Sequence, residues 1–376
     1  MKKLVVCFVS LFFLTACTDI REIQYQAYAV GLGIDFKDNN YIVTIQFLDF
    51  LNVAKSEQGK GDQPSKVWLG NGTGKSIEDA IDQINKGIQL PLNFDQVKVI
   101  VFGESLLKSK LKPTLYALDS SYNIRLTGNV YGTAQPLSNV FTAKIPFYYP
   151  FNESQISYPN AMQQQSSTVP PLTLQKFMYQ FNEKVSTILL PALSVNKEII
   201  KEDKEDYTVP IIEGAHLIKD KEWKGFLNAK DLTGFIRVNN ETVRTKLNLE
   251  YGNNQMEIEL SKPKMKQVVY KDKKKPSIGL KINLDATILS SNNRADSNEM
   301  KKQMKKQLIE EIYSSYEKSK EIGGDIYQFE NYLYRYHWDV WKSYKEGQFP
   351  PLSIDAIHIN VRNFKSVPKF NSKYQS

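Results

Sequence analysis

Cysteine is almost absent from this chain of 376 residues, which has only Cys7 and Cys17. Both lie close to the N-terminus, so the rest of the chain has no thiol and no disulfide to stabilise it. Its stability must come from a packed core. Hydrophobic residues make up 41% of the chain and aromatic residues 12%, which is enough apolar surface for two or three domains.

Long apolar runs are also absent, since none after residue 14 reaches the roughly 18 residues of a transmembrane helix. The run over 4–14 follows Met1-Lys2-Lys3 and leads into Leu14-Thr15-Ala16-Cys17. This order predicts a bacterial lipoprotein signal peptide over 1–16 that is removed. Cys17 would then carry an S-diacylglycerol group, with or without an N-acyl chain, and residues 17–26 would form a tether. An ordinary secretory signal or an N-terminal helix is the alternative.

Histidine is scarce, and His216, His337 and His358 do not have the spacing of metal ligands. A Gly-x-Ser-x-Gly nucleophile motif is missing as well. A lipid-anchored hydrolase would need a nucleophile or a metal site, so these gaps argue against it. We predict a protein that is not an enzyme and that uses no cofactor and no metal.

The formal net charge of +8 falls to +6 once Lys2 and Lys3 are removed. For an exported protein, this modest excess favours an anionic membrane surface over nucleic acid as a partner. Edge-strand protection and lipid headgroup contact are both open explanations for the densest group of lysines. This group comprises Lys262, Lys264, Lys266, Lys271, Lys273, Lys274 and Lys275.

Residues 27–145 have the pattern of an N-terminal α/β domain. Ser76 and Asp79 predict a capping box at a helix start, and the apolar run 97–102 predicts a strand buried on both faces. The expected elements are a strand over 25–34, a strand over 41–48, a helix over 77–88, a strand over 97–102, a helix over 106–118 that is kinked or started near Pro113, and a strand over 125–131.

The stretch Leu69-Gly70-Asn71-Gly72-Thr73-Gly74-Lys75-Ser76 has the look of a phosphate-binding loop. The required first glycine is replaced by Leu69, and no magnesium-binding acid follows the strand over 97–102. We therefore expect a glycine-rich entry into a capped helix, with Lys75 at its solvated start, and not a nucleotide site.

Residues 146–207 predict a connection and a small middle unit. Prolines and glutamines over 146–171 favour a linker or a long surface excursion. A short strand is expected over 186–195, and the polar stretch 197–207 is expected to separate that strand from the C-terminal part of the chain.

Residues 208–370 predict a C-terminal domain of antiparallel strands and two amphipathic helices. Apolar and polar residues alternate over 243–250, 256–260 and 278–285, as in a sheet with one wet face. A final strand after Pro351 changes phase near Ala356, which predicts a bulge. The two helical stripes are Met300, Met304, Leu308, Ile312, Tyr316 and then Ile326, Phe329, Leu333, Tyr336, Val340. The fold class is therefore α+β, mixed and multi-domain.

Aromatic side chains crowd the second stripe. Core packing should take about half of them, and a sugar-binding or membrane-dipping face is the alternative for the rest. They are Tyr332, Tyr334, Tyr336, Trp338, Trp341 and Tyr344.

Several of these segments together resemble one known family, the C subunit of the spore nutrient-germinant receptors (GerAC-type lipoproteins). The resemblance covers nearly the whole chain. Local departures are Thr18 in place of tryptophan, Gln96 in place of histidine and Leu118 in place of arginine. The matching segments are the lipobox with 19–23, then 30–35, 72–81, 97–104, 214–220 with 225–227, 325–329 with Trp338, and the lead at Phe349-Pro350 into a strand that ends Val361-Arg362.

The resemblance implies a non-catalytic lipoprotein with three mixed α/β domains of unusual topology. It implies two integral-membrane partners, an A-type and a permease-like B-type subunit, on the outer face of the spore inner membrane. It implies a response to amino acids or sugars, without deciding whether this subunit binds the nutrient. Asp35, Glu104 and Asp119 become candidates for partner contact, although surface solvation or capping is their default role. A solute-binding lipoprotein of a transporter is the alternative, but it should show two lobes of regular strand–helix alternation.

Overall fold

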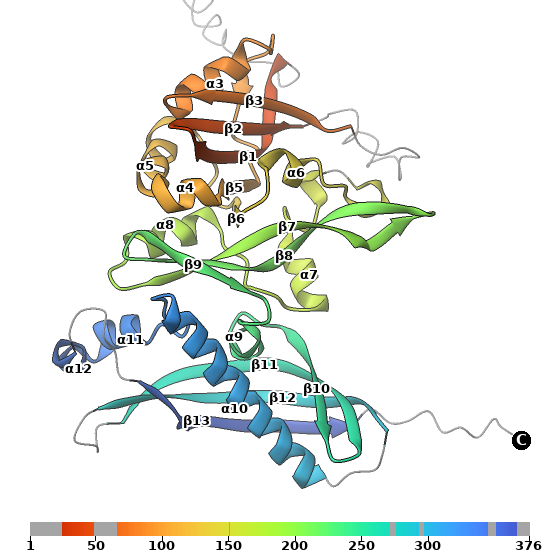
Figure 1. Cartoon of the computed structure of the whole chain (residues 1–376), viewed down its shortest axis with the longest axis vertical. Coiled ribbons are helices and arrows are strands. Elements are labelled where there is room, and N and C mark those ends of the chain that lie inside the picture. Colours follow the sequence, from red (N-terminus) through yellow and green to blue (C-terminus); the bar gives the residue numbers. More distant parts are fainter. Residues whose placement is uncertain are drawn as a thin grey trace, which may run out of the picture.

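The computed structural model describes residues 25–48, 66–149, 151–270, 276–292, 297–344 and 351–366. Within these ranges the strands form two sheets (Figure 1). A nine-stranded sheet has the order β3-β2-β1-β5-β6-β7-β8-β9, with β4 beside β1, and a four-stranded sheet has the order β10-β11-β12-β13. Helices pack on both sheets, so the expected α+β class is confirmed.

The first part of the large sheet combines a hairpin with parallel strands. Its elements are β1 (Ala27–Lys37), β2 (Asn40–Phe47), β3 (Trp68–Gly74), α3 (Ile77–Asn85), β4 (Leu92–Asn93), β5 (Val99–Gly103), α4 (Glu104–Ser109), α5 (Leu111–Ser121) and β6 (Asn129–Thr133). β1 pairs antiparallel with β2 and parallel with β5, and β5 pairs parallel with β6. The expected strands over 25–34 and 41–48 pair with each other as a hairpin, and the fully buried strand over 97–102 is confirmed.

Two expected elements in this part need correction. The single helix over 106–118 is two helices, because Lys110 leaves the helical conformation with φ −134° and ψ 14°. Pro113 falls in the first turn of α5, where its missing N–H has no intrahelical acceptor to lose. β6 begins at Asn129 and not at residue 125, because a turn closes from Arg125 to Gly128.

The segment expected to be a linker is folded. Residues 146–171 contain η3 (Pro146–Tyr148), η4 (Phe151–Glu153) and α7 (Pro159–Gln165). They lie between α6 (Leu137–Phe141) and α8 (Leu174–Asn182). Ile156, Gln163 and Val169 are buried. Proline and glutamine richness therefore marks a connection that packs between β6 and β7, and not a free linker.

The large sheet continues past this segment through β7 (Thr187–Glu202), β8 (Glu205–Lys219) and β9 (Glu222–Asn228). β7 and β8 form a long antiparallel hairpin whose outer part projects from the sheet (Figure 1). The polar stretch 197–207 is the exposed end of this hairpin, so it pairs the two strands and does not separate them. The expected boundary after residue 207 falls inside β8, and the division into domains stays a prediction.

The C-terminal sheet is covered by helices on one face. Its elements are α9 (Thr233–Val238), β10 (Arg244–Tyr251), β11 (Asn254–Tyr270), β12 (Ser277–Ser291), α10 (Ser297–Glu321), α11 (Phe329–Tyr336), α12 (Trp338–Ser343) and β13 (Leu352–Ser366). α10 crosses the sheet (Figure 1) and buries the whole first stripe, as expected. β13 pairs parallel with β12, and the register shifts between Leu352 and Ile357, as expected near Ala356.

The second stripe does not form one helix. His337 breaks it into α11 and α12 with φ −141°, and Tyr336 is 67% exposed.

Lys262, Lys264 and Lys266 lie exposed on β11 beyond its last pair with β10, which favours edge protection. Lys271 to Lys275 lie outside the described residues. Among the described helices, none is both long and apolar enough to cross a membrane.

Candidate functional site at strand β8

Strand β8 lies between the two halves of the molecule and gives one face to each. Ala215 and Leu217 belong to the core of the C-terminal sheet, whereas Ile218 belongs to the core around β1 and β5. Successive side chains of a strand point to opposite faces, so the segment 214–219 contacts both cores at once. Two polar clusters result from this position, one on each side of β8.

The first cluster surrounds His216, which is buried on the side of β6. Its Nδ1 accepts a hydrogen bond of 3.2 Å from Nε1 of Trp223 on β9. The neutral ring then carries its proton on Nε2, and that atom has no hydrogen-bond partner among the described residues. Burial lowers the pKa of His216 to about 4, so the ring is neutral at pH 7. The charge of Glu104 raises this pKa and the charge of Lys108 lowers it, both by smaller amounts.

Gly132 of β6 makes room for this ring. A Cβ at Gly132 would lie 2.3 Å from Cδ2 of His216. That separation is too short for any side-chain atom, so the glycine and the histidine fit only as a pair.

Glu104 and Lys108 connect α4 to this cluster. They form an ion pair one turn apart on α4, and Nζ of Lys108 lies 4.6 Å from the centre of the Trp223 ring. A cation over an indole face is favourable. Glu104 is therefore part of the His216 surroundings and is also partly exposed.

Asp35 holds the start of the same helix. Its Oδ1 accepts hydrogen bonds from the backbone N–H groups of Phe36, at 2.8 Å, and of Leu106, at 3.1 Å. The Leu106 N–H is one of the first donors of α4, which have no acceptor within the helix. Asp35 is only 8% exposed, so its place is internal, as an acceptor for the α4 N-terminus.

The other candidates are Asp119 and Cys17. Asp119 is exposed near the end of α5. Cys17 lies outside the described residues. The roles of Cys17, Glu104 and Asp119 stay predictions, and the internal contacts of Asp35 favour a structural role over a direct partner contact.

The second cluster is a buried ion pair on the other side of β8. Nζ of Lys219 lies 2.6 Å from Oε2 of Glu330 on α11, and the two side chains are 5% and 1% exposed. Asp325 is buried beside them, and its Oδ2 accepts a hydrogen bond of 2.8 Å from the Glu330 N–H. Burial raises the pKa of Asp325 to about 6. The backbone hydrogen bonds from Glu330 and Phe329 and the charge of Lys219 lower the pKa by smaller amounts.

Further hydrogen bonds tie β7 to the loop before α11. The Asp325 N–H donates to Oγ1 of Thr187 at 3.1 Å, and the Thr187 N–H donates to Oε1 of Gln328 at 3.3 Å. Gln328 adopts a left-handed conformation with φ 56°, which turns the chain into α11. Breaking a buried ion pair on one side is costly, so this cluster fixes how α11 sits on the large sheet.

Sequence reasoning missed Lys219, Glu330, Trp223 and Lys108 as members of a site. The segments 214–220 and 325–329 each carried part of the family resemblance, but nothing in either segment indicates that they touch. Lysine and glutamate are rarely buried, so their residue types alone do not indicate that Lys219 and Glu330 form an internal pair.

The glycine-rich stretch forms strand β3, not a loop. β3 pairs with β2 over its whole length, and a Cβ at Gly72 would lie 1.9 Å from the carbonyl oxygen of Ala80. The glycines therefore let α3 pack directly on the strand. The capping box is confirmed, with the Asp79 N–H donating to Ser76 Oγ at 3.0 Å, and Lys75 is exposed at the helix start.

The remaining histidines make single aromatic contacts. Nε2 of His337 lies 3.4 Å from the Tyr332 hydroxyl, and the ring of His358 packs edge-on against Tyr270. In the part of the chain that the structure describes, no three histidine, cysteine, aspartate or glutamate side chains are grouped so as to hold a metal ion.

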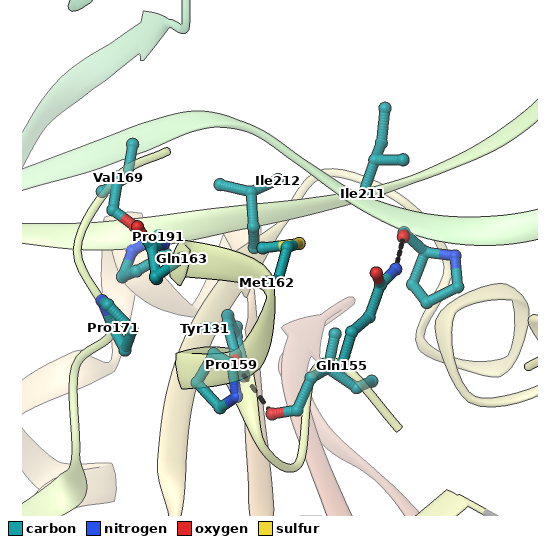
Figure 2. Close-up of a pocket in the computed structure, with 12 residues that line it drawn as sticks. Tyr131, Gln155, Pro159, Met162, Gln163, Val169, Pro171, Pro191, Ile211 and Ile212 are labelled. Atoms are coloured by element: carbon teal, nitrogen blue, oxygen red, sulfur yellow. Dashed lines mark hydrogen bonds between the residues drawn. The ribbon is translucent and has the colours of Figure 1, made fainter. Parts of the chain in front are cut away.

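An apolar pocket lies between α7 and the β7–β8 hairpin (Figure 2). Tyr131, Met162 and Ile212 line it, the Tyr131 hydroxyl donates to the Ile156 carbonyl at 2.8 Å, and Gln155 donates to the Pro210 carbonyl. The free space is about 10 Å³, which is room for about one water molecule. This pocket is too small for an amino acid or a sugar.

A polar cleft of about 570 Å³ opens at the start of β5 and β6. Its walls carry Lys98, whose Nζ lies 4.5 Å from the centre of the Tyr158 ring, and Lys176, which forms an ion pair with Glu241. Arg125 is exposed at its rim. The size and the charges of both signs would suit a small polar molecule.

Comparisons with known proteins agree with this arrangement. Residues 19–195 match the family described as "Spore germination protein N-terminal domain", and residues 213–363 match "Spore germination B3/ GerAC like, C-terminal". A solved structure titled "Crystal Structure of the GerBC protein" is 17% identical, with a TM-score of 0.53, and the alignment covers 93% of this chain and 100% of that one. That likeness shows the fold.

A curated relative from Bacillus subtilis (strain 168), the "Putative spore germination protein YfkR", is 22% identical over 189 residues. The alignment covers 49% of this chain and 47% of the relative, so it spans about half the length of that protein. The two family regions together cover most of the sequence. The chain therefore belongs to the GerAC-type spore germination family.

Proposed function

We propose that this chain is the lipid-anchored, non-catalytic C subunit of a spore germinant receptor. It is needed for nutrient-triggered germination and acts through contact with two integral-membrane subunits at the outer face of the spore inner membrane. The observation that carries this proposal is the match of both halves of the chain to GerAC-type spore germination regions.

The sequence supports the anchor. Cys17 directly follows Leu14-Thr15-Ala16 at the end of a short apolar run, which is the order of a lipoprotein processing site. Two acyl chains on one sulfur hold a protein at a membrane where a single chain gives only reversible binding. Confinement to one membrane raises the effective concentration of membrane partners, so a modest interface suffices.

The polar clusters support action by contact. Asp35, His216, Lys219 and Glu330 are buried, and their partners are other parts of the same chain. Asp35 and His216 make contacts within the large sheet and its helices, and the Lys219–Glu330 pair joins that sheet to the C-terminal half. A rigid body that presents a fixed outer surface is what a binding subunit requires.

Purification from spore membranes tests the proposal. The full chain, tagged at its C-terminus and expressed from its own locus, should be recovered in mild detergent together with two multispanning proteins, one of them permease-like. Spores without the chain should fail to germinate when amino acids or sugars are added. Recovery of the chain without membrane proteins, together with normal nutrient germination of the deletion strain, would refute the proposal.

A further inference from the structure

One end of the molecule carries an apolar groove that the two polar clusters do not use. It lies between β3, the end of β2 and the end of α3, at the end of the molecule farthest from the C-terminal sheet (Figure 1). Its walls include Phe47, Leu69, Ile84 and Ile88. None of the described residues that line it is aspartate, glutamate, lysine or arginine, although these make up 24% of the chain.

Large apolar side chains at this groove face outward. Trp68 is 62% exposed, which makes it the most exposed of the four tryptophans, and Leu90 is 39% exposed. Val67, which precedes Trp68 in the sequence, is also exposed, as is Tyr25, two residues before Ala27. Apolar surface gathered in this way, without charge, marks a contact surface more often than a solvated one.

The groove lies where the tether of the proposed anchor enters the fold. Ala27 lines it, and the Ala27 N–H donates to the Pro91 carbonyl at 2.9 Å, directly after Leu90. The stretch from Cys17 to Ala27, fully extended, spans about 35 Å at most, at about 3.3–3.6 Å per residue. An acylated Cys17 would therefore keep this groove within about 35 Å of the lipid headgroups.

We propose that this groove lies against the bilayer, with Trp68 and Leu90 at the boundary between headgroups and acyl chains. The inference rests on the lipid anchor of the proposed function. Tryptophan favours this boundary because its ring is apolar and its N–H can remain hydrated. Because no charged side chain among the described residues lines the groove, contact with lipid would bury apolar surface without the free-energy cost of removing a charge from water.

Quenching of tryptophan fluorescence tests the contact. The acylated full chain is reconstituted into phosphatidylcholine–phosphatidylglycerol vesicles with brominated acyl chains, which quench only indoles that touch them. We expect tryptophan emission to fall relative to unbrominated vesicles. Trp68→Phe should remove that fall. Trp338→Phe, which changes a tryptophan on α12 in the C-terminal half, should still show it. Equal quenching in the Trp68→Phe variant, or no quenching of a chain that floats with the vesicles, would overturn the inference.

Two measurements separate this inference from the anchor itself. Mass spectrometry and flotation report acylation, and a chain that is neither acylated nor bound refutes the anchor and the groove contact together. A photo-crosslinker in place of Trp68 in spore membranes should give lipid adducts. Adducts with a membrane subunit, or with residues 49–65 of this chain, would assign the groove to another occupant and overturn the lipid contact.

Discussion

Lys219 and Glu330 form an ion pair of 2.6 Å in which neither side chain reaches the solvent to any useful extent. One lies at the end of β8 and the other in α11, so the pair joins the large sheet to the C-terminal half. Its energetics should therefore be visible in the stability of the whole chain.

Removing one partner of this pair should destabilise the protein strongly. Glu330→Gln removes the carboxylate that lies 2.6 Å from the buried Lys219 ammonium group, and the expected loss is about 3–5 kcal/mol of unfolding free energy. Denaturant unfolding of the full chain measures it. As a control, Lys246→Ala removes an ion pair with Glu257 in which Lys246 is mostly exposed, and it should cost less than about 1 kcal/mol. Similar losses in the two variants would contradict the buried role.

Asp325 should make the protein less stable as pH rises. Its pKa is raised from 3.8 to about 6 in the folded chain, so the fold favours the protonated form. The contribution is fully present below pH 3.8 and is lost as pH rises through about 6, a loss of about 3 kcal/mol at about 1.4 kcal/mol per pKa unit. Asp325→Asn, which cannot ionise, should show a flatter stability profile between pH 4 and 6. Parallel profiles for the variant and the unchanged chain would argue against this assignment.

His216 should act in the opposite direction. Because the pKa of His216 is lowered to about 4 in the fold, its contribution to stability is present above pH 6.5 and is lost as pH falls through about 4.

Gly132→Ala would place a methyl group against the His216 ring and should cost about 1–3 kcal/mol of unfolding free energy. His216→Ala should abolish most of that extra cost in the double variant. Gly87→Ala, where the nearest atom is 3.5 Å away, is the matched control. An additive double variant would contradict direct packing.

The anchor gives a prediction for fractionation. Cys17→Ala should leave an unprocessed or released protein without lipid label, because membrane affinity depends on the acyl chains at that sulfur. Cys7→Ala changes the other cysteine of the chain, inside the expected signal peptide, and should be processed and labelled normally. Full membrane retention of a mature, unlabelled Cys17→Ala protein would contradict acylation.

Partner contact can be tested at Glu104, which is partly exposed, and at Asp119, which is exposed. Glu104→Ala and Asp119→Ala should reduce recovery of the membrane subunits by about tenfold, the effect of losing about 1.4 kcal/mol of binding free energy. Glu250→Ala, an exposed acid on β10, serves as a control and should leave recovery unchanged. Circular dichroism of each variant checks the fold. Unchanged recovery in the Glu104 and Asp119 variants would place the interface elsewhere.

Local patterns were enough to predict several elements of the fold. The capping box of Ser76 and Asp79 and the stripe from Met300 to Tyr316 each depend on residues within a few turns of one another. Such signals need no knowledge of the rest of the chain. They were correct in type, with ends that differ by a few residues.

Long-range relationships could not be predicted in the same way. Nothing near Lys219 indicates that Glu330 covers it, and nothing near Gly132 indicates the ring of His216. Composition also misled where burial is set by distant elements, since the proline- and glutamine-rich connection packs Ile156 and Gln163 inside. The helical stripe also placed Tyr336 with the buried residues, but Tyr336 is the last residue of α11 and is 67% exposed.

The position of β8 has a consequence for dissecting this protein into fragments. The first family region ends at residue 195 and the second begins at residue 213. Strand β8 runs from Glu205 to Lys219 and pairs with β7 on one side and with β9 on the other. A fragment that stops at residue 195 would leave the edge of β7 that faces β8 unpaired, and it would remove Ile218 from the core that also holds Leu190. One that starts at residue 213 would expose Ile218 to water. Sequence similarity divides the chain into two regions. Because both regions depend on β8, a truncated or fused protein would keep the native packing only if it contained both.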